Sequence, residues 1–69
     1  MYNRYTMNEP TLLTENQTAE RLNIKRATLT VWRCRKKGPP YIRIEGAIRY
    51  PKDELEAWIS SRRVSHEAL

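Results

Sequence analysis

The sequence predicts one small, mostly helical domain that carries a single β-hairpin. Two observations predict the helices: apolar residues recur at helical spacing in three segments, and capping residues or prolines bound these segments. A third observation predicts the hairpin, because apolar residues alternate with others on both sides of Glu45-Gly46. With 69 residues, the chain has room for one domain with a thin core.

Composition and charge favour a negatively charged partner. The formal net charge is +5 and the isoelectric point is about 9.8. The 39% of apolar and 30% of charged residues are typical of a soluble globular fold. A single cysteine and a single histidine, Cys34 and His66, exclude a disulfide framework and argue against a metal site. Because no apolar run approaches the ~20 residues that span a bilayer and no signal peptide is evident, the expected location is the cytoplasm.

The first helix is predicted over residues 15–22. The sequence from Thr14 to Gln17 matches a capping box, in which the two side chains satisfy each other's backbone amides. Asn23 suits a left-handed stop directly after the helix. The preceding residues 1–10 lack periodicity and predict a flexible lead-in, within which Met1 and Met7 both remain open as the native start.

The second helix is predicted over residues 26–37. Only three residues separate it from the first helix, and so short a connection makes two helices cross, as in a helix-turn-helix. Leu29 and Trp32 form its inner stripe, and Gly38 with the two prolines behind it is expected to end the helix. Lys25 takes the cap position, where serine or aspartate is favoured, which indicates that stability is exchanged for positive charge.

The hairpin is predicted over residues 41–50. Its large apolar residues are expected to share one buried face: Ile42, Ile44, Ile48 and Tyr50. Because directly opposed residues share a face, Ile44 must then lie opposite Ile48. This register predicts a three-residue loop over 45–47.

The same register places Arg43 directly opposite Arg49 on the outer face. Two like charges in this arrangement destabilise a hairpin unless an anion neutralises them. The pair is therefore expected to straddle a phosphate or reach a minor groove. The alternative is that both arginines extend into solvent at a small cost.

The third helix is predicted over residues 52–62. Pro51 fits its first turn, Asp53 and Glu54 suit its positive end, and Leu55 and Trp58 begin its inner stripe. The predicted organisation is a lead-in over 1–10, a helix-turn-helix domain over 11–62 and a tail over 63–69.

The outer face of the second helix is the predicted DNA-binding surface. Small residues occupy its centre and basic residues flank it, without an acidic residue between Lys25 and Arg43. A small centre lets a helix approach the floor of a major groove, where Thr30 can reach a base edge and arginines can reach guanines or phosphates. A solvated helix face is the alternative, but exposed Ala, Val and Cys fit it poorly. The predicted DNA-binding residues are Lys25, Arg26, Ala27, Thr30, Arg33, Cys34, Lys37, Arg43 and Arg49.

Enzymatic activity is not predicted. The sequence offers no pair of nucleophile and base, no glycine-rich phosphate loop and no set of metal ligands. Asp53 and Glu54 are explained by the helix dipole. We therefore expect a non-enzymatic protein without a cofactor.

Four segments carry a resemblance to a known family: "TENQTAERLNI", "TLTVW", "GPPYIRI" and "IRYPKDELEAWI". Over residues 12–59, the chain resembles the excisionase-like and prophage-regulator (AlpA-type) helix-turn-helix domains, small relatives of the MerR DNA-binding module. The resemblance implies a winged helix-turn-helix, with a recognition helix in the major groove and a hairpin wing against the backbone or minor groove. Lys25 departs from the family's small cap residue.

The resemblance also implies biological roles. Such domains help an integrase excise a mobile element, or they regulate transcription of phage and island genes. Double-stranded DNA is the implied partner, with an integrase or recombinase as a further one, and the protein is expected to be a monomer or a weak, DNA-assisted oligomer. The sequence leaves the choice between excisionase and regulator open. The alternative from another class is a protein-interaction module whose basic face docks an acidic partner.

Overall fold

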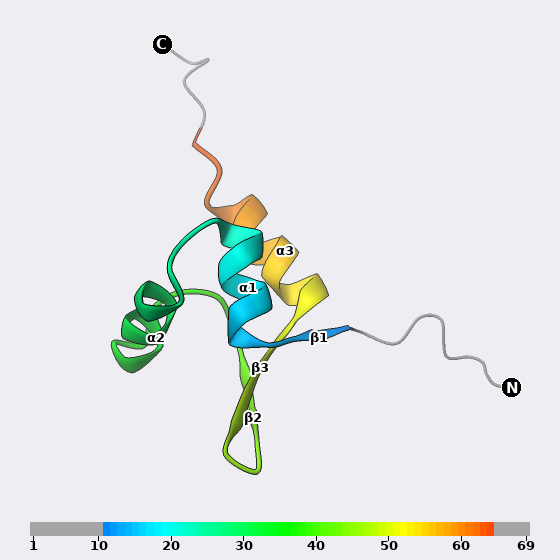
Figure 1. The fold of residues 1–69 in the computed structure, drawn as a ribbon. Coiled ribbons are helices and arrows are strands. Elements are labelled where there is room, and N and C mark those ends of the chain that lie inside the picture. Colours follow the sequence, from blue (N-terminus) through cyan, green and yellow to red (C-terminus); the bar gives the residue numbers. More distant parts are fainter. Residues whose placement is uncertain (1–10, 65–69) are drawn as a thin grey trace, which may run out of the picture.

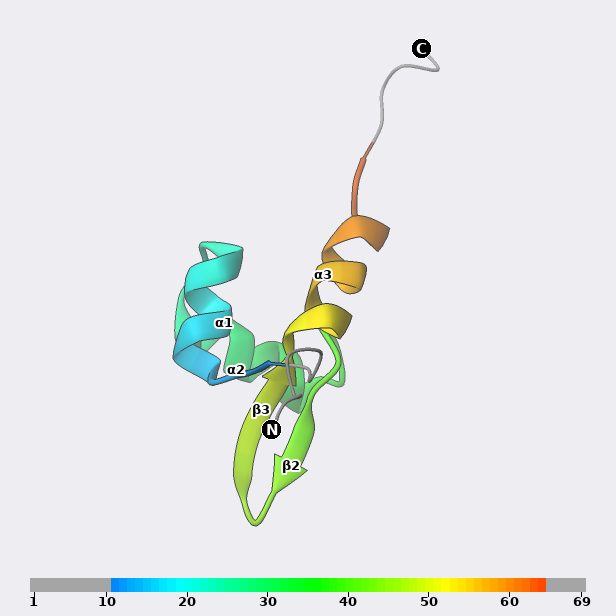
Figure 2. The ribbon, with the colours of Figure 1, turned by 90° about the vertical axis from the view of Figure 1, so that its right-hand side faces the viewer.

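The computed structural model describes residues 11–64 and contains three helices and three short strands. In chain order these are β1 (Leu12–Leu13), α1 (Glu15–Leu22), α2 (Arg26–Cys34), β2 (Ile42–Ile44), β3 (Ala47–Pro51) and α3 (Lys52–Ser61). The β2–β3 hairpin projects away from the three helices (Figures 1 and 2). This arrangement is compatible with a winged helix-turn-helix and confirms the predicted fold class. The predicted lead-in, the choice of start and His66 lie outside the described residues.

Helix α1 has the predicted bounds and the predicted caps. The Thr14 hydroxyl accepts a hydrogen bond from the Gln17 amide at 3.1 Å, and the Gln17 side chain accepts one from the Thr14 amide at 2.9 Å. At the other end, Asn23 has a φ of 58°. This left-handed residue lets the Ile24 amide donate to the Ala19 carbonyl at 3.0 Å, which turns the chain sharply toward α2.

Helix α2 begins where predicted but ends at Cys34, three residues before the predicted end. Lys36 adopts a φ of 58°, and the Lys37 amide donates to the Trp32 carbonyl at 2.7 Å. These bonds cap the last turn before the chain reaches Gly38, so the prediction that Gly38 ends the helix is wrong. Gly38 is required instead for close packing, because a Cβ there would lie 3.1 Å from Cε3 of Trp32.

The core lies between the helices and β3. Leu29, Tyr50 and Leu55 are at most 1% exposed, and Ala19 is also buried. Thr18 is fully buried, and its hydroxyl donates to the Thr14 carbonyl at 2.8 Å. The partly buried residues packed against this core are Leu13, Leu22, Ile24, Trp32 and Ile48.

The two tryptophans link α2 to α3. The ring centroids of Trp32 and Trp58 lie 6.2 Å apart, within the range of favourable aromatic pairs. This contact agrees with the predicted inner stripes of the second and third helices, to which the two tryptophans belong.

The three strands form one antiparallel sheet in the order β1-β3-β2. Strand β1 was not predicted, because two residues show no periodicity. It pairs Leu12 with Pro51 and Leu13 with Tyr50. Nearby, the Lys52 amide donates to the Thr11 carbonyl at 2.8 Å, so the start of the domain is fastened to the junction of β3 and α3.

The predicted three-residue loop of the hairpin is wrong. Ile44 lies opposite Ala47, so the turn contains only Glu45 and Gly46. Their φ values of 49° and 86° suit a two-residue turn that follows the natural twist of paired strands. A glutamate in the left-handed region is uncommon, and here the turn geometry prevails over the hydrophobic pattern that predicted the longer loop.

The observed register separates the two arginines of the wing. Arg43 lies opposite Ile48, and Arg49 lies opposite Ile42, so the predicted opposition of Arg43 and Arg49 is wrong. Ile42 and Ile44 do not face the core but are 38% and 45% exposed. Because a shift of one residue turns every side chain to the other face, Arg43 now shares a face with Ile48.

Helix α3 begins at Lys52 and ends at Ser61, one residue before the predicted end. Pro51 is the last residue of β3 and caps the helix from outside, with a φ of −62°, rather than lying in its first turn as predicted. Asp53 and Glu54 occupy the first turn, where carboxylates favour the helix dipole.

A bidentate ion pair joins α1 to α3. Arg21 donates to Glu56 at 2.6 and 2.7 Å, and these hydrogen bonds lower the pKa of the Glu56 carboxyl below its usual value near 4.5. The pair therefore stabilises the fold above that pH, and the contribution is lost as pH falls through the lowered pKa.

We expect Glu56→Gln to lower the free energy of unfolding at pH 7 but not at pH 2, measured by urea unfolding. Glu20→Gln, at an exposed position of α1, is the control, and a difference for Glu56→Gln that persisted at pH 2 would contradict the assignment.

Candidate nucleic-acid interface

The exposed face of α2 has a centre of small residues. Ala27 and Cys34 are exposed, Val31 is 45% exposed and Thr30 is half-buried. Leu29 points the opposite way into the core with 1% exposure. The side chains on this face are short, so another molecule has room to approach the backbone of the helix.

Basic residues surround this surface. Lys25 is exposed at the start of α2, and its side chain forms no cap hydrogen bond, so its ammonium remains available. Beyond the other end of the helix, Arg35, Lys36 and Lys37 are all exposed. The first turn of α2 contains no acidic residue. The surroundings of the small centre are thus strongly cationic.

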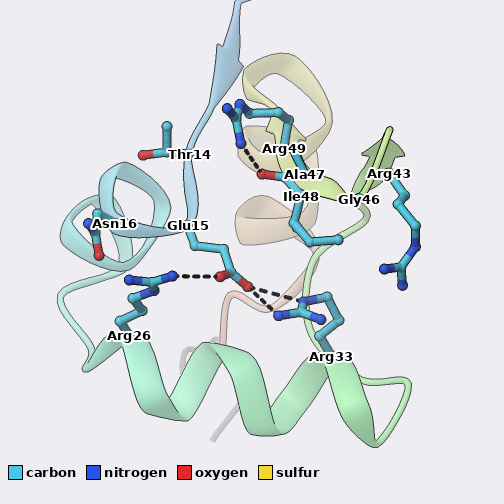
Figure 3. A pocket seen from close by; sticks show the side chains of 10 residues that line it. All are labelled: Thr14, Glu15, Asn16, Arg26, Arg33, Arg43, Gly46, Ala47, Ile48 and Arg49. Atoms are coloured by element: carbon cyan, nitrogen blue, oxygen red, sulfur yellow. Dashed lines mark hydrogen bonds and ion pairs between the residues drawn. The ribbon is translucent and has the colours of Figure 1, made fainter.

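A cavity of about 410 Å³ lies between the start of α1, helix α2 and the wing (Figure 3). Its charged lining consists of four arginines and one glutamate. The lining residues are Thr14, Glu15, Asn16, Arg26, Arg33, Arg43, Gly46, Ala47, Ile48 and Arg49. The cavity therefore has a surplus of positive charge beside the exposed face of α2.

Glu15 lies at the centre of this lining. Its carboxylate accepts two hydrogen bonds from Arg33, at 2.6 and 3.1 Å, and a longer one from Arg26 at 3.4 Å. The Glu15 side chain is only 11% exposed, although glutamates in the first turn of a helix commonly lie in solvent. The carboxylate joins the start of α1 to both ends of α2.

Arg33 is held on several sides. Its side chain is 17% exposed, and the hydrogen bonds to Glu15 raise the pKa of its guanidinium. The guanidinium carbon also lies 5.9 Å from the ring centroid of Tyr41, which in turn packs against Tyr50. Burial raises the pKa of the Tyr50 phenol above its usual value of 10.0. Arg33 therefore braces α1 and the hairpin against α2.

The wing arginines point in different directions (Figure 3). Arg43 is exposed and forms no ion pair or side-chain hydrogen bond with any residue between 11 and 64. Arg49 is half-buried and donates to the Ile48 carbonyl at 2.8 Å. Among the residues that the structure describes, Arg43 is thus the wing arginine whose donors have no partner.

The structure divides the predicted site residues into two groups. Ala27, Thr30 and Cys34 lie along the outer face of α2, with Lys25 and Lys37 beyond its two ends. The four predicted arginines converge on the cavity instead: Arg26, Arg33, Arg43 and Arg49. Sequence reasoning missed the central role of Glu15, because its contact with Arg33 joins residues 18 positions apart and leaves no local signal.

The part of the chain that the structure describes holds neither a metal-binding cluster nor a membrane-spanning helix. No three side chains of the metal-binding types come together there. None of the three helices has the length and apolar character of a membrane-spanning segment.

Comparison with known proteins identifies the family. The family description "Helix-turn-helix domain" matches residues 12–63, which is most of the chain. A search of curated proteins and a search of solved structures each returned no match. Helix-turn-helix domains are DNA-binding rather than catalytic modules, and both the fold and the basic surface around α2 agree with that role. The chain therefore belongs to the helix-turn-helix domain family.

Proposed function

We propose that the protein binds double-stranded DNA sequence-specifically, with α2 in the major groove and the wing against the backbone or minor groove. The observation that carries this proposal is the exposed face of α2, whose small centre lies within a basic surround. A major groove admits a helix, and short side chains let the axis of the helix approach the base edges. A protein that docked an acidic protein partner would need the charge but not the small centre.

The proposed roles differ between residues. Thr30, Ala27 and Cys34 face the base edges, where a hydroxyl can exchange hydrogen bonds and apolar atoms can contact thymine methyl groups. Lys25, Lys37 and the arginines that remain free supply phosphate contacts, which set the orientation and most of the salt dependence. Arg33 and Arg49 have protein partners and contribute mainly to the positive potential.

The biological role that we propose is excision or gene regulation in a mobile element. This proposal is supported by the resemblance of residues 12–59 to excisionase-like and prophage-regulator domains. It includes action in the cytoplasm, contact with an integrase in the excision case, and a monomer or a weak oligomer that DNA assembles. Deletion of the gene distinguishes the two roles, since loss of excision with unchanged transcript levels identifies an excisionase.

DNA binding is tested by titrating a labelled duplex, recovered by selection from random sequence, at several salt concentrations. We expect the logarithm of affinity to fall steeply with the logarithm of salt, by about 0.9 for each phosphate neutralised. The variant with both Arg26→Ala and Arg43→Ala should bind more weakly with a shallower slope. Equal affinity for selected and scrambled duplexes, or a slope near zero, would contradict the proposal and favour an acidic protein partner.

A further inference from the structure

A row of charged side chains crosses the cavity between α1, α2 and the wing. In Figure 3, Arg26, Glu15, Arg33 and Arg43 follow one another across it, with Arg26 and Arg43 at the two ends. Only one carboxylate lies among the four arginines of the lining. The cavity therefore has more cationic donors than the described residues can satisfy.

The two arginines on Glu15 are not held equally. Arg33 bonds the carboxylate at 2.6 Å with a side chain that is 17% exposed, whereas Arg26 reaches it at 3.4 Å with a side chain that is 60% exposed. Charge-assisted hydrogen bonds are strong near 2.8 Å and weaken as they lengthen. Arg26 can thus leave Glu15 for a better acceptor at little cost, while Arg33 remains fixed.

Arg43 approaches from the other side. The two-residue turn of the wing places Arg43 on the same face as Ile48, which lines the cavity, and leaves its guanidinium without a partner in residues 11–64. A guanidinium presents a planar fork of donors that matches two oxygens of a phosphate. Two such forks, one from α2 and one from the wing, therefore enclose a space suited to an anion with several oxygens.

We propose that this cavity seats the phosphodiester backbone of one DNA strand, gripped by Arg26 and Arg43, with the Glu15–Arg33 pair as its fixed floor. The inference rests on the proposed function and sharpens it, because it assigns the wing to the backbone rather than to the minor groove. Arg26 acts as a movable side chain that rests on Glu15 in the free protein and transfers to a phosphate oxygen on binding.

The experiment pairs protein variants with chemically neutralised phosphates. A set of the selected duplexes, each with one phosphate replaced by an uncharged methylphosphonate, is titrated against wild-type protein, Arg26→Gln and Arg43→Gln. We expect one phosphate, or two neighbouring ones on a single strand, whose neutralisation weakens wild-type binding at least roughly tenfold, because charge-assisted hydrogen bonds to both arginines are lost. The same neutralisation should weaken the Arg26→Gln and Arg43→Gln proteins by a smaller factor, since each variant has already lost one of the two contacts.

Arg63→Gln is the matched control, because it removes the same charge from an exposed position beyond α3. Its response to every methylphosphonate should equal that of the wild type. If the wild type binds with a steep salt dependence but no phosphate is coupled to both arginines, or if they couple to opposite strands, the inference is wrong and the proposed function stands. If wild-type binding is insensitive to salt and to every methylphosphonate, both are wrong.

Discussion

Replacing Val31 with glutamate is expected to abolish specific DNA binding and leave the fold intact. Val31 is 45% exposed at the centre of the small face of α2, so the carboxylate would be pressed against the base edges and phosphates of the groove. Such a juxtaposition of like charges costs several kcal/mol, which corresponds to a loss of at least about 100-fold in affinity. Stability should change by no more than about 0.5 kcal/mol, since the site is on the surface and glutamate is a good helix former. Duplex titration and thermal unfolding measure the two effects.

Two controls separate groove insertion from a general loss of charge. Val31→Ala keeps the surface small and neutral and should retain most of the affinity. Ser60→Glu adds the same negative charge at an exposed position on α3 and should weaken binding only slightly, because salt screens distant charges. If Val31→Glu weakened binding no more than Ser60→Glu does, α2 would not enter the groove.

Replacing Leu29 with alanine is expected to unfold the domain, although Leu29 is only two residues away from Val31 on the same helix. Its side chain is 1% exposed and packs in the cluster with Ala19 and Tyr50. Truncation of a buried leucine costs about 2–5 kcal/mol through lost burial and the cavity left behind. In a domain this small that loss is comparable with the whole free energy of unfolding. Circular dichroism should show a largely unfolded protein at 37 °C before any urea is added.

Leu29→Met preserves the volume of the side chain and should cost less than about 1.5 kcal/mol. Its transition should remain cooperative, and its DNA affinity should stay near that of the wild type. A loss below about 1 kcal/mol for Leu29→Ala would mean that the residue does not support the core.

The helices could be predicted because their signals are local. The capping box from Thr14 to Gln17 and the left-handed Asn23 fix both ends of α1 within a few residues. The end of α2 was missed because Lys36, a residue that seldom adopts a positive φ, provides the left-handed cap. Gly38, the obvious candidate, has its positive φ two residues later and packs against Trp32.

The register of the wing could not be predicted from hydrophobic pattern alone. Alternation at Ile42, Ile44, Ile48 and Tyr50 favours one shared face, but the hairpin extends from the body and only β3 is held against the core. Its turn conformation at Glu45-Gly46 then decides the pairing. Burial fixes the register of a strand only where one of its faces is covered.

The ion pairs around Glu15 also could not be predicted from the sequence. Arg26 and Arg33 were predicted to contact DNA because basic residues on an exposed helix indicate a polyanionic partner. Whether an arginine is free depends on which carboxylate the fold brings beside it, and Glu15 lies 18 positions before Arg33 in the chain. Charge pattern identifies the basic surface, and only the tertiary contacts separate the arginines that hold the fold from those available to a ligand.

The short β1–β3 pairing has a consequence for how the protein folds. It places Leu12 opposite Pro51, so α1, α2 and the wing lie within one closed loop of the chain. The capping box, the sharp turn after α1 and the hairpin join residues that are close in sequence and form at small entropic cost. Closing β1 on β3 pairs residues 39 positions apart, so it carries a larger loop-closure entropy than the local turns do. The shortest strand of the domain therefore makes the most non-local pairing of its sheet.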